Sequence, residues 1–462
     1  MTGVSMKHPS RRQFIKLGAL GAGTILLPGA GVAEPPAPAD DEHFFLLIVL
    51  EGGADTSYMF DARPLAMTKA GKIQNYLGQE PGIWAGRNGV STLATKLVAP
   101  LSPFRDRFSV LNGVYMTPSF DGHLQNMNFL FSGSPFGGDS FIPHLNLAET
   151  GRVPGSLDAV MPTEPVFINV GNHSGVVPLQ PKSLEQLARR LRQSAPPQAA
   201  DKLGEFVRNR LSVMSSGEGR FASGARLMLS GLDQAPDVHR KLAMLQAPGE
   251  DLSPEQQSIA LIAECFRLSL SRSAIYVLRE QFDVHDADQA KRQPELFADA
   301  LQKIAVLFQS LVDTPFDAKR SMFDVTTVMV ASEFGRTMRA PDMPIDGTGT
   351  NHNQYANSVL IGGKGIRSHL VIGASDLADE KARASRAHLA MDPSLEKVMG
   401  RPMDFKTLRA RPDQPDGFNV QDYLTIGSVV NTLYSMFGVP SSRYRSMGRN
   451  LPSAPVLRAL LA

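Results

Sequence analysis

The amino-acid sequence predicts an α/β fold built on a mainly parallel sheet. Residues 44–50 (FFLLIVL) are a continuous apolar run of strand length, which is typical of a central strand covered on both faces. Residues 293–314 carry apolar side chains at helical spacing and lie between two further strand-like runs, at 274–278 and 323–330. A strand, a helix and a second strand in this order indicate a β-α-β unit, whose two strands are parallel.

The rest of the chain fits one large domain. Residues 356–361 again form a strand-like run that ends in a Gly-Gly pair. Residues 182–270 carry helical patterns instead, and we expect a helical insertion there. Residues 34–42 are rich in proline and polar side chains, so we expect a poorly ordered linker. Large single α/β domains of this length are common, and we therefore expect one domain over residues 43–462.

The first 33 residues predict export from the cytoplasm. Residues 10–16 (SRRQFIK) form a twin-arginine motif, an apolar stretch runs from Leu17 to about Gly29, and Ala33 precedes a plausible cleavage point. This pattern is typical of a signal peptide recognised by the twin-arginine (Tat) export machinery. The alternative is a basic arm followed by a buried helix. The favoured location of the mature chain is therefore the periplasm or the cell exterior.

Charge and hydropathy give no support for nucleic-acid or membrane-spanning roles. Loss of residues 1–33 would lower the formal charge from +2 to −2, because this segment carries four basic and no acidic residues, namely Lys7, Arg11, Arg12 and Lys16. The remaining sequence has no basic run with interleaved aromatics and no second long apolar stretch. We therefore expect a soluble mature protein that binds no nucleic acid and has no membrane span.

Cys265 is the single cysteine, so no intramolecular disulfide can form despite the oxidising compartment. It lies in an apolar segment, IALIAECF at 259–266. A buried core thiol is therefore the expected state, since free cysteine behaves as a small apolar residue.

Five short motifs place acidic or imidazole side chains beside glycines or after a predicted strand. They are Gly52-Gly53-Ala54-Asp55, Gly122-His123-Leu124, Phe282-Asp283-Val284-His285, Ser332-Glu333-Phe334-Gly335-Arg336-Thr337 and Gly349-Thr350-Asn351-His352. Ligands bind open parallel sheets outside the carboxyl ends of the strands. Carboxylates and imidazoles are costly to bury alone, so together they favour a metal site.

Each of these residues also has a simpler explanation. An Asp beside glycine, such as Asp55 or Asp283, often caps a turn or a helix. A single histidine, such as His123 or His285, is more often a hydrogen-bonded core residue than a ligand. Only the joint occurrence of the motifs favours a metal.

The order of these motifs resembles a known family. The export signal, Gly-Gly-x-Asp, Phe-Asp-x-His, Ser-Glu-Phe-Gly-Arg-Thr and Gly-Thr-x-His follow one another as in the exported bacterial family called domain of unknown function 1501. This family is grouped with the alkaline phosphatase-like superfamily, which includes phosphatases, sulfatases and phosphomutases. The resemblance extends over nearly the whole mature chain, and it implies a three-layer α/β/α fold with a metal site at the sheet edge.

The resemblance also implies roles for individual residues. It makes ligands of one or two divalent ions (Zn, Mn or Ca) of six side chains, namely Asp55, His123, Asp283, His285, Glu333 and His352. Such ions suit transfer of a phosphoryl or sulfuryl group from an ester. Arg336 would hold the oxygens of that group, because its planar fork matches them. The alternative for Arg336 is a salt bridge that fixes its loop.

The chain departs from the family pattern at two positions. The family usually has Ser before the histidine at 123, and here Gly122 supplies no hydroxyl nucleophile. The candidates nearby are Thr56, Ser57, Thr117 and Ser119, although a metal-bound water could attack instead. The family usually has Asp at position 351, and the uncharged Asn351 would favour weaker metal binding or one ion over two.

Three functions remain open from the sequence. The favoured one is an exported metal-dependent hydrolase of phosphate or sulfate esters, with a small ester or a saccharide as substrate. The second is a catalytically lapsed relative that keeps the metal for binding or envelope assembly. The third is a structural partner protein without a metal, in which the polar motifs only hold loops together.

Overall fold

The structure is a computed structural model of the whole chain, and it places about two thirds of the residues well enough to describe. Described are residues 42–69, 76–116, 122–132, 140–146, 166–170, 177–179, 198–216, 251–280, 282–336, 350–377, 398–413, 419–439 and 454–462, with scattered residues between 186 and 249. The predicted signal peptide and almost all of the predicted linker lie outside the described residues.

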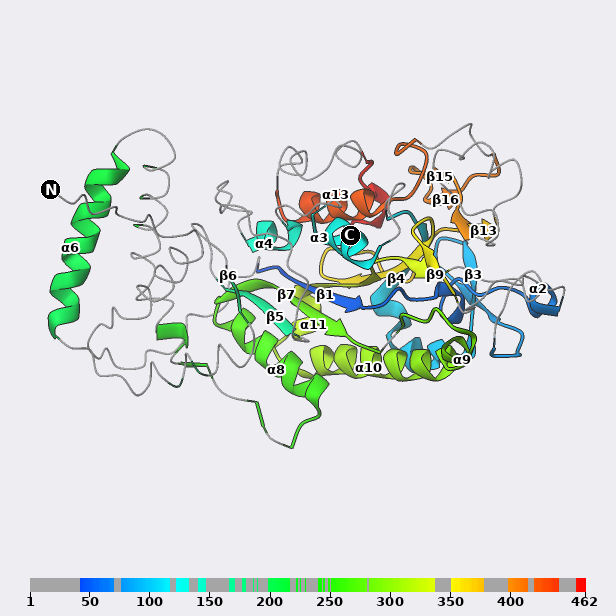
Figure 1. Cartoon of the computed structure of the whole chain (residues 1–462), viewed down its shortest axis with the longest axis horizontal. Helices are drawn as coiled ribbons and strands as arrows, with labels where there is room; N and C mark the ends of the chain where they lie inside the picture. The colour runs from blue at the N-terminus through cyan, green and yellow to red at the C-terminus, as the bar shows by residue number, and fades with distance from the viewer. Residues whose placement is uncertain are drawn as a thin grey trace, which may run out of the picture.

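A sheet of eight strands forms the centre of the molecule (Figure 1). Its spatial order is β12 (Val371–Gly373), β4 (Phe108–Val114), β11 (Asn357–Gly363), β8 (Thr326–Ser332), β1 (Phe44–Leu50), β7 (Ser271–Leu278), β5 (Val166–Val170) and β6 (Val177–Leu179). The β1 strand pairs in parallel with both β7 and β8, whereas β11 and β5 run antiparallel to their neighbours. Six strands therefore run in one direction, which confirms the mainly parallel sheet.

Helices cover both faces of the sheet. Below it in Figure 1 lie α8 (Pro254–Arg267) and α10 (Gln293–Asp313), and above it lie α3 (His123–Ser132), α4 (Phe141–Asn146) and α13 (Ile426–Met436). The 3-10 helix η2 (Lys96–Arg107) and the short α11 (Met322–Val325) pack with α10. This arrangement is the expected three-layer α/β/α architecture.

The pattern of β1 explains why both faces are covered. Alternate side chains of a strand point to opposite faces of a sheet. Phe44, Leu46, Ile48 and Leu50 lie in the core beneath α8 and α10, while Phe45, Leu47 and Val49 lie in the core beneath α13. An uninterrupted apolar run is therefore what a strand between two helical layers requires.

Helix termini follow local sequence signals. Ser253 accepts a hydrogen bond from the Gln256 backbone while the Gln256 side chain returns one to the Ser253 backbone, a capping box that begins α8. A proline occupies the first turn of both α8 and α10, where its missing N–H costs nothing. Because α8 packs against α10 and β7, this part of the expected helical insertion belongs to the main helical layer.

Smaller elements surround these layers. They are η1 (Thr56–Tyr58), α2 (Leu65–Lys69), α6 (Gln198–Ser215), α9 (Ala287–Lys291), η5 (Arg458–Leu460) and the paired strands β2 (Gly82–Ala85) with β3 (Ser91–Ala94), β9 (Gly335–Arg336) with β10 (His352–Asn353), β13 (Ser375–Leu377) with β14 (Val398–Gly400), and β15 (Met403–Asp404) with β16 (Arg409–Ala410). Among the described residues no helix has the length and hydropathy needed to cross a bilayer.

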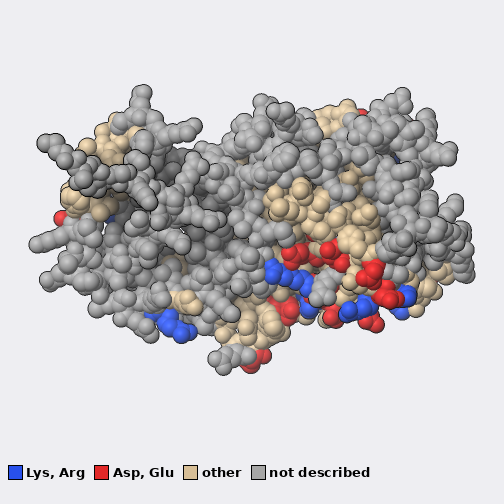
Figure 2. Space-filling view, viewed as in Figure 1, with Lys and Arg blue, Asp and Glu red and all other residues tan. Residues whose placement is uncertain are grey.

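The surface over α9 and α10 mixes acidic and basic side chains (Figure 2). Lys291 pairs with Asp288 on α9, and Lys303 of α10 pairs with Glu280. Cys265 is fully buried in α8, as expected for a core thiol, and burial raises the pKa of its thiol.

Candidate metal centre

The candidate centre lies at the carboxyl edge of the sheet. Leu50, the last residue of β1, is level with Leu278 of β7 and Ser332 of β8 in the parallel register. The loops that follow these three strands therefore leave the sheet side by side. Three of the five sequence motifs lie on these loops, which is why residues far apart in the sequence become neighbours.

Gly52 and Gly53 allow the three loops to approach one another. Both have positive φ angles, 111° and 80°, which L side chains rarely adopt. A Cβ atom on Gly52 would lie 2.8 Å from the Asp283 backbone nitrogen, and one on Gly53 would lie 2.1 Å from the ring of Phe334. The Gly-Gly pair is thus required by close approach of backbone and ring, and not by a direct role in chemistry.

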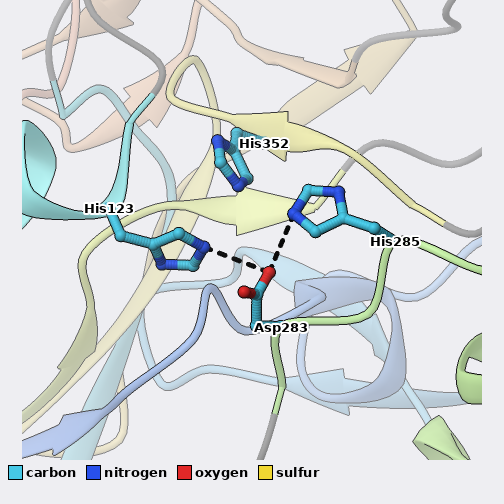
Figure 3. Close-up of side chains that lie close together, drawn as sticks. All are labelled: His123, Asp283, His285 and His352. Atoms are coloured by element: carbon cyan, nitrogen blue, oxygen red, sulfur yellow. Dashed lines mark ion pairs between the residues drawn. The ribbon is translucent and has the colours of Figure 1, made fainter.

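Four side chains from the motifs converge on one point (Figure 3). Each can offer one ligand atom such that all four atoms lie within 4.8 Å of one another, the four residues being His123, Asp283, His285 and His352. His123 begins α3, Asp283 and His285 lie between β7 and α9, and His352 lies in β10. Within the described part of the chain, this is the one group of three or more potential metal-binding side chains with such spacing.

Local hydrogen bonds fix the segment that carries His352. The strand β10 pairs with β9, so that His352 lies opposite Arg336. The backbone nitrogen and the hydroxyl of Thr350 both donate to the carbonyl of Val284. Asn351 accepts a hydrogen bond from the His352 backbone through its side-chain oxygen. These bonds tie the last motif to the loop that carries Asp283 and His285.

Asp283 is the acceptor around which the centre is arranged. Its Oδ1 lies 3.1 Å from His123 Nε2, 2.9 Å from His285 Nε2 and 2.6 Å from Arg336 Nη2. Burial alone would raise the pKa of Asp283, but the hydrogen bond and charge of Arg336 and the two imidazoles lower it overall. The carboxylate is therefore ionised at neutral pH, as a metal ligand must be.

The two imidazoles beside Asp283 differ in their protonation. Burial and the charge of Arg336 lower the pKa of His285, which favours the neutral ring that binds metals. Burial also acts to lower the pKa of His123, but the hydrogen bond to Glu333 and the charges of Glu333 and Asp283 raise it overall.

Glu333 lies behind His123. Its side chain is fully buried, and Oε1 accepts hydrogen bonds from His123 Nδ1 at 2.9 Å and from the Gly52 nitrogen at 2.8 Å. Oε2 accepts a hydrogen bond from Ser332 Oγ at 3.0 Å. A proton held on Nδ1 leaves the Nε2 lone pair of His123 directed at the centre, which is how carboxylates commonly orient metal-binding histidines.

The donor set fits a divalent cation. Three imidazoles and one carboxylate form a set typical of zinc and of related transition ions. His123 Nε2 is buried and lacks a hydrogen bond within the described structure, although it lies near Asp283. A buried imidazole nitrogen is costly without a partner, and a cation between these side chains would satisfy it.

Asp55 lies outside this group of four. It caps η1, because its Oδ1 accepts hydrogen bonds from the backbone nitrogen and the hydroxyl of Ser57 at 3.0 and 2.6 Å. Its Oδ2 is buried without a hydrogen bond in the described structure. Burial raises the pKa of Asp55 to about 6. The geometry matches the capping role that the sequence left open, and it does not place Asp55 among the four converging ligand atoms.

Arg336 takes the salt-bridge arrangement. Its side chain is fully buried, bonded to Asp283, to the carbonyl of Gly53 at 3.1 Å and to the carbonyl of Gly52. The guanidinium therefore joins the first loop to the second. Its Nη1 is buried and forms no hydrogen bond in the described structure.

Position 122 offers no hydroxyl to the centre. Gly122 precedes α3, and its carbonyl accepts the first helical hydrogen bond, from the Asn126 nitrogen. A Cβ atom on Gly122 would lie 2.2 Å from the side-chain oxygen of Gln125, so the amide of Gln125 fills the space of the missing side chain. Ser57 is fully buried and bonded to Asp55, while Thr117 and Ser119 lie outside the described residues.

Three residues near the centre received no role in the sequence analysis. The ring of Phe334 packs against His123 and His352, with centroids 4.8 and 4.4 Å away. Ser332 holds Glu333, as described above. Glu51 directly follows β1 and pairs with Arg279 at 3.0 Å. Burial, opposed by the charge of Arg279, raises its pKa, and its charge acts on Glu333 and His123. The signal for Glu51 was available, since it ends a strand as the other motifs do.

Comparison with known families supports the resemblance. The model of the family described as "Protein of unknown function (DUF1501)" matches residues 168–391, which confirms the resemblance to this family over that segment. The segment contains Asp283, His285, Glu333, Arg336 and His352. The sequence matches none of the curated proteins.

Solved structures with a related arrangement include three proteins. The PH0037 protein from Pyrococcus horikoshii has 12% identity and a TM-score of 0.28, with 71% of this chain and 89% of that chain covered. The lipoteichoic acid synthase LtaP from Listeria monocytogenes has 8% identity and a TM-score of 0.33, with coverage of 95% and 81%. A protein in the alkaline phosphatase superfamily from Vibrio parahaemolyticus has 11% identity and a TM-score of 0.26, with coverage of 79% and 72%. These scores are too low to carry an argument, so the fold assignment rests on the sheet and its helical layers.

Proposed function

We propose that this chain, which matches the DUF1501 family over residues 168–391, is an exported metal-dependent hydrolase of phosphate or sulfate esters. One observation carries the proposal: His123, Asp283, His285 and His352 come from three separate segments and converge within 4.8 Å at the carboxyl edge of the sheet. Three imidazoles and a carboxylate are costly to gather in this way without a cation. The twin-arginine motif supports the export step.

The surrounding groups suit an anionic substrate. A bound divalent cation would polarise an ester oxygen and lower the pKa of a water, so that a nucleophile is available at neutral pH. The first N–H groups of α3 lie beside the centre, because this helix begins at His123, and helix N-termini favour anions. Asp283 and His285 have half-exposed side chains, so they form the side open to substrate.

The protein residues divide into ligands and positioning groups in this proposal. His123, Asp283, His285 and His352 bind the ion. Glu333 holds the proton on His123 Nδ1, and Arg336 holds Asp283 in place. Three nitrogen ligands favour zinc or manganese over calcium, since calcium prefers six to eight oxygen ligands. A single cluster of four ligands in the described chain favours one ion over two.

The test combines metal content with hydrolysis. Protein purified from the periplasm should contain about one equivalent of zinc or manganese by elemental analysis, and should release nitrophenol from phosphate or sulfate nitrophenyl esters. Asp283→Asn and His285→Ala should lose both properties. Asp288→Asn is the matched control, because Asp288 lies on the adjacent α9 and pairs only with Lys291 at the surface. Metal-free protein, or equal activity in all variants, would refute the proposal.

Gly122 favours a second candidate, a catalytically lapsed relative that binds the metal without turnover. Gly122 supplies no hydroxyl at the start of α3, and Gln125 occupies the space. Purified protein with a full metal complement and no esterase activity would select this candidate. Hydrolysis gained in Gly122→Ser, with Gly122→Ala as its control, would then identify the missing group.

A further inference from the structure

A second polar cavity opens at the edge of the sheet opposite to the metal centre. Its volume is about 450 Å³, within the range typical of small-molecule sites. Its wall includes the segment before β12, where His369 donates a backbone hydrogen bond to Phe108 at the start of β4. A seven-residue strand such as β4 spans about 20 Å. The cavity is therefore separate from the centre at the other end of the strands.

The cavity is lined by two arginines. The guanidinium of Arg367 contacts only the carbonyl of Ala459, at 3.5 Å, and has no carboxylate partner within the described structure. Arg87 pairs with Asp106 at 2.7 Å, but both side chains are more than 60% exposed, so this pair is weak and leaves the arginine able to exchange partners. Arg105 lies next to the wall, where its Nε donates to His369. The local charge is thus positive.

The backbone around the cavity is strained. Among the described residues three that are not glycine have a positive φ, namely Ser269, His369 and Leu408. Leu408 lines the cavity, and His369 lies between two residues that line it. A positive φ is unusual for a bulky residue such as leucine. Backbone strain of this kind concentrates at ligand sites, where the surrounding structure maintains it.

Hydrogen bonds maintain both strained residues. The carbonyl of His369 accepts from the Arg87 nitrogen at 2.7 Å, and the carbonyl of Leu408 accepts from the Gly373 nitrogen at 3.2 Å. The side chain of His369 is fixed by Asp106 and by the carbonyl of Ala85, at 2.9 and 3.0 Å. The wall is therefore preorganised, which lowers the entropic cost of binding.

The remaining wall combines apolar and hydroxyl groups. Ile366, Leu370 and Leu408 supply an apolar surface, and Ser368 supplies a hydroxyl close to Arg367. The faces of a sugar ring are apolar while its rim carries hydroxyls, so a sugar matches both parts. The planar fork of an arginine matches the oxygens of a sulfate or phosphate group.

We propose that this cavity binds a monosaccharide ester of sulfate or phosphate. The oxyanion lies between Arg87 and Arg367, and the sugar ring lies against Leu370 and Leu408. The proposal does not depend on the proposed function, because none of these residues contributes to the metal centre.

Calorimetric titration of the whole mature chain tests this inference, with a chelator present to prevent turnover. Glucose 6-sulfate, glucose 6-phosphate, glucose and inorganic sulfate are the probes. We expect both esters to bind and glucose not to bind, with affinity at least tenfold weaker in Arg367→Ala and in Arg87→Ala. Arg267→Ala, which changes an exposed arginine of α8 paired with Glu264, and Asp283→Asn should bind as the wild type does.

Three results would overturn the proposal. Equal affinity in the wild type and Arg367→Ala would mean that the cavity is not the site. Loss of binding in Asp283→Asn would move the site to the metal centre. Inorganic sulfate bound as tightly as the esters would show an adventitious ion only. Arg367→Gln, which keeps much of the side-chain volume, should reproduce the loss seen in Arg367→Ala if that variant folds poorly.

Discussion

His123 Nδ1 lies 2.9 Å from Glu333 Oε1, although the two residues are 210 positions apart in the sequence. This hydrogen bond joins the start of α3 to the end of β8. It directs the opposite ring nitrogen of His123 towards Asp283, and it leaves Glu333 bonded on both carboxylate oxygens. The bond therefore places Glu333 behind a ligand, in an orienting role.

Glutamine at position 333 should retain most of the metal affinity. In Glu333→Gln the side-chain oxygen can still accept from His123 Nδ1 and the Gly52 nitrogen, so we expect at most about a tenfold loss. Glu333→Ala removes the acceptor, and loss of such an orienting partner typically costs 10- to 100-fold. Competition with a chromogenic chelator measures both constants for zinc and manganese. Equal, large losses in the two variants would instead make Glu333 a direct ligand.

Asp283 should be the most sensitive position of the centre. Asp283→Asn keeps the size of the side chain but removes the charge that faces two imidazoles and Arg336, so we expect at least a hundredfold loss of metal affinity. Metal should then no longer raise the melting temperature, because stabilisation by a ligand requires binding to the folded state. Differential scanning calorimetry with and without zinc measures this effect. An unchanged metal-induced rise would remove Asp283 from the ligand set.

The Gly-Gly pair gives a prediction about stability alone. Gly53→Ala would place a methyl group 2.1 Å from the Phe334 ring at a φ of 80°, and we expect a loss of about 3 kcal/mol from strain and overpacking together. Gly78→Ala is the matched control, since Gly78 has a φ of 60° but no atom within 4 Å of the added carbon. There the expected loss is about 1 kcal/mol. Urea unfolding in a chelator compares the two, and similar losses would mean that Phe334 moves aside.

The sequence predicted the elements that have simple patterns. The strand expected at residues 44–50 has the same bounds as β1, because a strand covered on both faces is uniformly apolar. The helix expected at 293–314 corresponds to α10. The run at 323–330 divides into α11 and the first part of β8, because Ser321 and Asp324 form a capping box that extends a short helix into an apolar strand pattern.

The arrangement of strands could not be derived from local patterns. The strand β11 lies antiparallel between β4 and β8, and this placement depends on packing between segments distant in the sequence. The same limit applies to the site. Strand ends identified Asp283 and Glu333 as candidates, but only burial and contact geometry separate the converging Asp283 from the orienting Glu333. Asp55 has the same sequence signal and instead caps η1.

Asp55 should make the protein less stable as the pH rises from about 4 to 6. Burial raises its pKa from the ordinary value of 3.8 to about 6 in the fold, so the folded state favours the protonated carboxyl. This contribution is fully present below pH 3.8, declines as the unfolded chain ionises, and is lost above pH 6. The difference corresponds to about 3 kcal/mol. Asp55→Asn cannot ionise and keeps an oxygen for the Ser57 bonds, so the variant should lack this decline.

The measurement compares urea unfolding of the wild type and Asp55→Asn at pH 4 and at pH 7, both in a chelator. Other carboxylates titrate equally in the two proteins and cancel in the comparison. We expect the free energy of unfolding of Asp55→Asn, relative to the wild type, to be about 3 kcal/mol more favourable at pH 7 than at pH 4. A relative stability independent of pH would show that Asp55 is ionised in the fold throughout. Its buried Oδ2 would then need a cationic partner, which would return Asp55 to the metal ligands.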